Sequence, residues 1–76
     1  MNEERRKKVA NVVAILADAK SQLEEIIGDE EEALDNMPEG MKSGEKGERA
    51  EEILESLKEA DDSIGAASDN LDAAVQ

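Results

Sequence analysis

The sequence predicts an all-α fold in which two long helices form an antiparallel hairpin that self-associates into a helical bundle. Apolar residues recur at heptad spacing in two long stretches of the chain. The only proline and three of the five glycines gather between these stretches, where they indicate a turn. A single domain of 76 residues without cysteine has few ways to become stable alone, which favours association with other chains.

The first helix is expected over about residues 3–36. One of its apolar series comprises Val9, Leu16 and Leu23, and a companion series, offset by three residues, comprises Val12, Ala19, Ile26 and Ala33. Glu30 interrupts the first series, and we expect it to pair with Arg49 of the second helix. The residue before a proline disfavours the α conformation, so Pro38 should end the helix near Asn36.

A loop is expected over about residues 37–46 and the second helix over about 47–75. The second helix repeats the pattern, with one series at Ala50, Leu57, Ile64 and Leu71 and a companion at Ile53, Ala60, Ala67 and Ala74. Folding the chain at the loop places residues whose numbers sum to about 80 opposite each other. Leu16 then faces the small residues around Gly65, which permits a tight helix contact or, alternatively, the approach of a ligand or partner.

The first helix carries more apolar surface than one antiparallel neighbour can cover. Its apolar residues Val9, Val12, Val13, Ile15 and Leu16 span more than half of the helix circumference. A helix that is apolar nearly all round is buried on more than one side. We therefore expect a homo-oligomer, with these residues and Gly65 in its packing contacts.

The composition excludes most chemistry. The chain has no cysteine, no histidine and no aromatic residue, which removes disulfides, ordinary zinc sites, nucleophilic triads and base-stacking surfaces. The acidic run that starts at Asp29 lacks the ligand spacing of an EF-hand. No stretch approaches the roughly 18 apolar residues of a membrane span. We expect no enzyme activity, cofactor, metal site or membrane contact.

Charge is segregated along the chain, whose formal net charge is -12. A basic cluster near the N-terminus, Arg5, Arg6, Lys7 and Lys8, is a candidate anion site for a phosphorylated small molecule or, alternatively, a solvated cap that offsets the acidic body. Candidate residues for an acidic interaction face are Glu24, Glu25, Glu31, Glu32 and Asp35. These carboxylates cannot bind nucleic acid directly but could imitate its phosphates, or they could simply be solvated.

Two runs flank the turn, one from Asp29 to Glu39 (DEEEALDNMPE) and one from Gly44 to Glu52 (GEKGERAEE). In these runs the chain resembles a group of short, uncharacterised acidic helical proteins of bacteriophages and prophages. The resemblance implies a small accessory protein of the host cytoplasm that sequesters a host defence protein or its nucleotide signal. An acidic nucleic-acid mimic and a structural coiled-coil component of a phage assembly are the alternatives.

Overall fold

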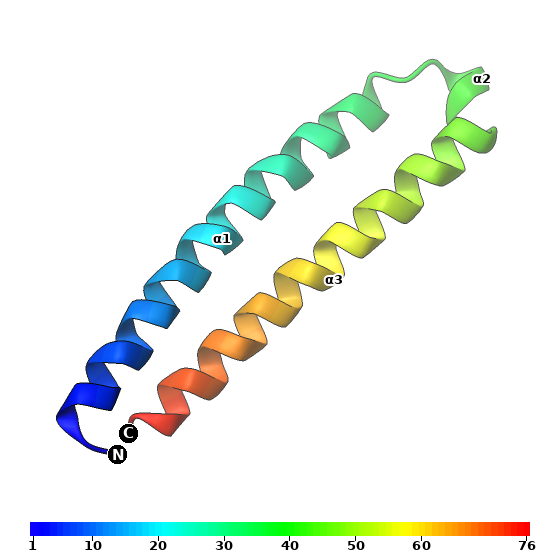
Figure 1. Cartoon of the computed structure of the whole chain (residues 1–76). Helices are drawn as coiled ribbons and strands as arrows, with labels where there is room; N and C mark the ends of the chain where they lie inside the picture. The colour runs from blue at the N-terminus through cyan, green and yellow to red at the C-terminus, as the bar shows by residue number, and fades with distance from the viewer.

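The computed structural model describes all residues, 1–76, and consists of three helices without any strand. The helices are α1 (Glu3–Asp35), α2 (Glu39–Lys42) and α3 (Glu45–Ala74). The predicted all-α class is thereby confirmed. The long helices α1 and α3 lie side by side and run in opposite directions, so both termini lie at one end of a rod (Figure 1). The rod measures 58 × 15 × 12 Å.

Local signals define both ends of α1. The side chain of Asn2 caps its N-terminus, where Oδ1 accepts a hydrogen bond of 2.8 Å from the backbone N–H of Arg5. Glu3 and Glu4 occupy the first turn, where the helix dipole favours negative charge. The helix ends at Asp35, three residues before Pro38, so α1 covers almost the same residues as the expected helix.

The segment expected to be a loop contains one helical turn, α2. Its first turn follows Pro38, whose φ of -58° suits the start of a helix, and the Pro38 carbonyl accepts hydrogen bonds from the N–H groups of Met41 and Lys42. The helix α3 begins just after, at Glu45. A Cβ atom on Gly47 would overlap the backbone carbonyl of Lys42. Position 47 therefore needs glycine because α2 packs directly against the first turn of α3.

The contact between α1 and α3 contains the first apolar series predicted for each helix. The second series in the contact is offset from the first by four residues and not by the predicted three. We call the residues of this contact the seam: in α1 Val9, Val13, Leu16, Lys20, Leu23, Ile27, Glu30 and Leu34, and in α3 Ala50, Leu54, Leu57, Asp61, Ile64, Ser68 and Leu71, followed by the C-cap residue Val75. The predicted companion series, offset by three residues, contributes less to this contact than the series offset by four: its residues Ala19, Ile53 and Ala67 are half-buried and the other five are exposed. Val12, Ile26 and Ala33 are exposed in α1, as are Ala60 and Ala74 in α3.

Side-chain size explains this correction. The offset of four brings Val13, Ile27 and Leu54 into the contact, whereas the rejected series consists mainly of alanine. It also brings in Lys20 and Asp61, whose charges lie opposite each other and form an ion pair. Larger apolar side chains bury more surface, at about 25 cal/mol per Å², so the two helices gain more by this choice.

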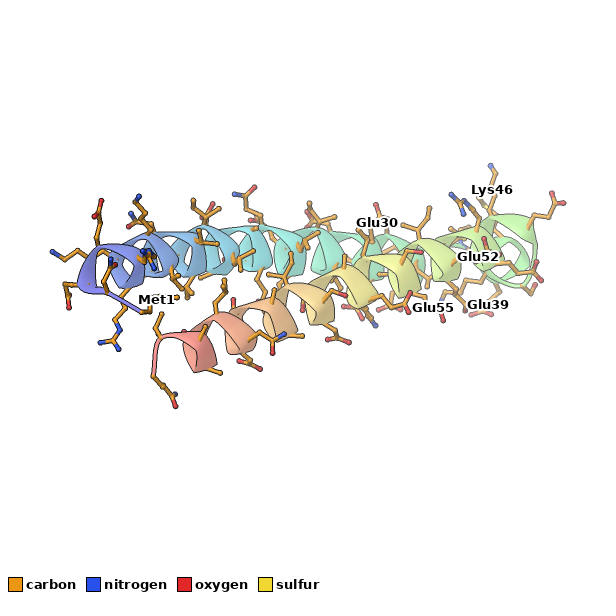
Figure 2. All side chains as sticks on the ribbon, turned by 60° about the horizontal axis from the view of Figure 1, so that its bottom comes forward. Met1, Glu30, Glu39, Lys46, Glu52 and Glu55 are labelled. Atoms are coloured by element: carbon orange, nitrogen blue, oxygen red, sulfur yellow. The ribbon has the colours of Figure 1, made fainter.

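The apolar core is thin. Only Ile27 (8 % exposed) and Leu54 (7 % exposed) are buried hydrophobic residues, and no side chain is fully buried. The aliphatic residues Val12, Ile15 and Ile26 remain 45 %, 67 % and 46 % exposed. Figure 2 shows side chains projecting from both helices along the whole rod. Two helices alone thus leave much of the apolar surface of α1 uncovered.

Candidate functional site

An ion pair lies in the middle of the seam. Lys20 Nζ donates hydrogen bonds to Asp61 Oδ2 (2.7 Å) and to Glu24 Oε2 (3.2 Å). The side chain of Asp61 is only 13 % exposed, and its other oxygen, Oδ1, is buried without a partner. The hydrogen bonds to Asp61 and Glu24 raise the pKa of Lys20 above its ordinary value of 10.5. Asp61 therefore depends on Lys20 for its charge compensation.

Gly65 lies beside the aliphatic stem of this lysine. A Cβ atom at position 65 would stand 3.6 Å from Lys20 Cε, an ordinary van der Waals distance. The two helix backbones do not meet at this point, so the tight contact expected from the sequence is a contact with a side chain. Glycine is compatible with this site, but the packing does not demand it.

A second ion pair identifies which flanks of the two helices share one side of the rod. Lys58 Nζ lies 3.2 Å from Glu31 Oε2. Glu31 follows the seam residue Ile27 by four positions, and Lys58 follows the seam residue Leu54 by four. Residues four apart neighbour each other on a helix surface. The flank of α1 that carries Glu31 and the flank of α3 that carries Lys58 therefore lie on the same side of the rod.

Carboxylates from both helices gather on this side and its outer edges. We call them the acidic face: Glu24, Glu25, Glu31, Glu32 and Asp35 of α1 with Glu51, Glu55, Glu59 and Asp62 of α3, all of them exposed. The structure thus brings the five acidic residues singled out in the sequence together with four from α3, which lie within the second acidic range, residues 45–62, that the sequence offers for a nucleic-acid mimic. The heptad pattern of α3 contained the signal, since these four residues flank its seam positions.

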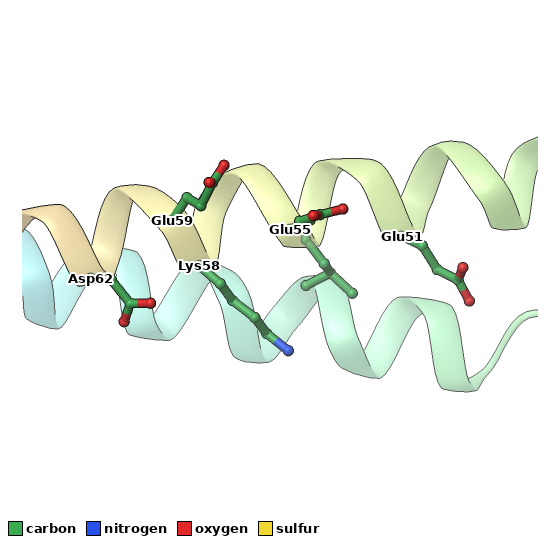
Figure 3. A pocket seen from close by; sticks show the side chains of 6 residues that line it. Glu51, Glu55, Lys58, Glu59 and Asp62 are labelled. Atoms are coloured by element: carbon green, nitrogen blue, oxygen red, sulfur yellow. The ribbon is translucent and has the colours of Figure 1, made fainter.

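An open groove of about 380 Å³ lies on the α3 part of the acidic face. Its lining residues are Glu51, Leu54, Glu55, Lys58, Glu59 and Asp62 (Figure 3). No group of three or more acidic side chains is arranged to hold a metal ion. An open groove of this composition attracts cationic side chains, and it offers no enclosed space in which water is excluded from a reacting group.

The basic cluster does not converge in a single chain. Arg5, Arg6, Lys7 and Lys8 are all exposed and occupy consecutive helical positions, which point about 100° apart around the axis. Lys8 Nζ lies 3.8 Å from Glu4 Oε1. The four side chains therefore form a basic collar around the start of α1 rather than a pocket.

The remaining expectations concern one ion pair and the packing residues. Arg49 Nη1 pairs with Glu52 Oε2 (3.2 Å) on its own helix, and the expected pair between Arg49 and Glu30 is not formed. Among the packing residues, Val9, Val13 and Leu16 lie in the seam, Val12 and Ile15 are exposed, and Gly65 contacts Lys20.

The other side of the rod carries small and apolar residues. Positions 12, 19 and 26 lie on the flank of α1 away from Glu31, and positions 53, 60 and 67 lie on the flank of α3 away from Lys58. Both sets therefore share the side opposite the Lys58–Glu31 pair. We call this surface the apolar face: Val12, Ile15, Ala19, Ile26 and Ala33 of α1 with Ile53, Ala60, Ala67 and Ala74 of α3. Sequence reasoning named these residues, but it assigned all except Ile15 to the seam.

No helix of the chain combines the length and the apolar character needed to cross a membrane. Comparison of the chain with protein-family models, curated proteins and solved structures finds no match among any of them. The functional argument therefore rests on the seam and the two faces.

Proposed function

We propose that the protein is a non-enzymatic binding protein that works as an oligomer of antiparallel helical hairpins and sequesters a partner protein through its acidic face. One observation carries this proposal. Nine exposed carboxylates from two helices gather on one side and its outer edges, where Lys58 is bonded to Glu31. The net charge of -12 strengthens the attraction of this surface for a cationic partner.

The chemistry of the face defines the kind of partner. Carboxylates held on two rigid helices are complementary to a surface rich in arginine and lysine, such as the phosphate-binding surface of a nucleic-acid-binding protein. The carrier helices are already formed, so binding orders side chains but little backbone. In the bacteriophage setting that the sequence resemblance implies, such a protein is an inhibitor of a host defence component.

Two other functions make different demands on the chain. Sequestration of a phosphorylated small molecule requires the basic cluster, whose four side chains diverge in a single chain and would have to be gathered by assembly. A structural coiled-coil component requires the seam and neither charged surface. The acidic face favours the protein partner, because it is assembled within one chain from both long helices.

The test compares two variants with the same change in charge. The first replaces Glu24, Glu25, Glu31, Glu32 and Asp35 with their amides. Its matched control replaces five carboxylates outside the acidic face, Glu3, Glu4, Asp18, Asp69 and Asp72, with theirs. The tagged proteins are used for affinity capture from the cells in which the chain is expressed, followed by mass spectrometry. We expect the first variant to lose a partner that the wild type and the control retain, and we expect binding of that partner to weaken steeply with NaCl.

Equal capture by both variants would refute a role for the acidic face. A third variant, with Arg5, Arg6, Lys7 and Lys8 replaced by glutamine, distinguishes the remaining functions. Loss of a captured small molecule in this variant alone would assign the function to the basic cluster. Capture that is unchanged in all three variants would leave the structural role.

A further inference from the structure

Much of the apolar face is left uncovered within the chain, including three large aliphatic side chains. Val12, Ile15 and Ile26 are each about half exposed or more. Between them the face of α1 carries the uncharged residues Ala19 and Gln22, and α3 adds Ile53 and several alanines. Small residues beside large ones allow another helix to approach closely and to interdigitate.

The chain exposes more surface than a compact monomer of its mass, and the excess is about the area that each chain buries in a stable dimer. The chain exposes 5572 Å². A compact monomer of 8.2 kDa exposes about 4,500 Å² by the usual scaling of surface with mass. The excess of about 1,000 Å² per chain compares with the roughly 800 Å² that each partner buries in a standard stable interface. A face along a 58 Å rod is long enough to supply this area.

The charge distribution favours an arrangement in which the second copy is rotated end for end relative to the first. The half of the rod near the termini, residues 1–20 and 60–76, carries a net charge of -2, and the half near the turn, residues 21–59, carries -10. Two rods with their turns at the same end would bring like charges together, which opposes association. Turning one rod end for end instead places the basic cluster, residues 5–8, beside Asp29 and Glu30 of the other copy, which do not belong to the acidic face.

Ala19 is the centre of three features at once. Val12 and Ile26 each lie seven residues from Ala19, and Lys8 and Glu30 each lie eleven residues from it. The ends of α1, Glu3 and Asp35, each lie sixteen residues away. A two-fold axis near Ala19 therefore places Val12 of one copy opposite Ile26 of the other and Lys8 opposite Glu30. It also aligns the two rods along their full length.

We propose that a second copy of this chain covers the apolar face in a two-fold symmetric, end-for-end arrangement centred near Ala19. The product is an antiparallel four-helix dimer in which each α1 packs against the α1 of the other copy. Such an interface is self-complementary, as two-fold symmetry requires. The inference rests on the proposed oligomer and specifies its contacts, and it leaves both acidic faces on the outside, free for a partner.

Cysteine substitution tests the contact, because the chain has no native cysteine. In purified Ala19→Cys protein, the two thiols meet at the axis, and we expect a disulfide-linked dimer on mild oxidation. The matched control is Ser21→Cys, an exposed position on the opposite flank of α1. It should stay monomeric on a non-reducing gel. Cross-linking of the control as fast as Ala19→Cys would overturn the proposed face.

Spin labels and mass test the arrangement and the stoichiometry. Labels on Ser43→Cys, in the turn, should lie at a separation approaching the 58 Å length of the rod. A short separation would mean that the turns share one end and would overturn the arrangement. Sedimentation equilibrium at micromolar concentration should give twice the 8.2 kDa of one chain, whereas a mass of 8.2 kDa would overturn the dimer.

A charge placed on the apolar face provides the matched mutational test. Ile15→Glu should halve the mass, while Ser21→Glu, which adds the same charge on the other flank, should leave the dimer intact. The cross-linking and label measurements do not depend on how stable the Ile15→Glu chain is. All of these experiments use the purified protein without a partner. Suppose that the dimer forms but the variant with amides on the acidic face still captures the same partner as the wild type. This result would refute the proposed function and would leave the proposed dimer standing.

Discussion

Three glycines within the long helices should respond differently to the same substitution, alanine. Alanine in a helix interior is more stable than glycine by about 0.5–1 kcal/mol, because glycine loses more backbone entropy on folding. At Gly28 a Cβ atom would meet nothing within 4 Å, so Gly28→Ala should raise the free energy of unfolding by this amount. At Gly65 the Cβ atom would meet Lys20 Cε at 3.6 Å, so Gly65→Ala should also be stabilising or neutral.

Gly47 should behave in the opposite way. A Cβ atom there would overlap the backbone carbonyl of Lys42, which cannot rotate aside as a side chain can. Overpacking typically costs about 1–3 kcal/mol, and a clash with backbone belongs at the upper end. After the gain in helix propensity is subtracted, Gly47→Ala should lower the free energy of unfolding by about 2 kcal/mol.

Thermal unfolding followed by circular dichroism measures these differences. One kcal/mol shifts the Tm of a domain of this size by roughly 4–8 °C, so Gly28→Ala and Gly47→Ala should melt more than about 10 °C apart, on opposite sides of the wild type. Neither position belongs to the acidic face or the apolar face, so the comparison is independent of both proposals. If both variants melted above the wild type, the close approach of α2 to α3 would be refuted.

Three further predictions test the seam and the charge distribution. In a chain kept monomeric by Ile15→Glu, Ile27→Ala should cost about 2 kcal/mol in urea denaturation and Ile26→Ala less than about 1 kcal/mol, because only Ile27 is buried; equal losses would contradict the offset of four. Because folding raises the pKa of Lys20 above 10.5, the stability from its bonds to Asp61 is fully present below that pH and is lost as the pH rises through the folded pKa. The Tm should thus fall above pH 10.5 by more in the wild type than in Lys20→Met, and identical pH profiles would contradict this. The Tm should rise from low salt with added NaCl, since residues 21–76 carry -14 and salt screens their repulsion; a falling Tm would show that specific ion pairs dominate.

The helical class and the place where the chain turns follow from the amino-acid sequence alone. Strong helix formers fill both long stretches, and Pro38 with its neighbouring glycines interrupts them, so local propensity alone predicts the break. The Lys20–Asp61 ion pair joins residues whose numbers sum to 81, close to the expected 80. The turn α2 and the need for glycine at position 47 were not predictable, because they depend on how two backbones meet.

The basic cluster and the acidic face also depend partly on the sequence and partly on how the helices pack. The sequence identified a basic cluster and an acidic stretch as opposite charges on one helix. The divergence of Arg5, Arg6, Lys7 and Lys8 around the axis follows from their consecutive positions in the predicted helix. Which acidic residues of α1 share a side with those of α3 depends on which flanks the two helices turn toward each other.

Which flank of each helix forms the seam depends on how the two helices pack against each other. On a helix surface, a leucine such as Leu16 or Leu23 has neighbours both three and four positions further along the chain. The apolar spacing in the sequence is therefore compatible with a second series offset by either three or four residues. The offset of four places one charged residue, Lys20 or Asp61, in the apolar series of each helix. Across the seam their charges compensate each other, and Ile27 and Leu54 become buried. The helix pair therefore packs its larger side chains together and leaves Val12, the alanines and Ile26 on the apolar face.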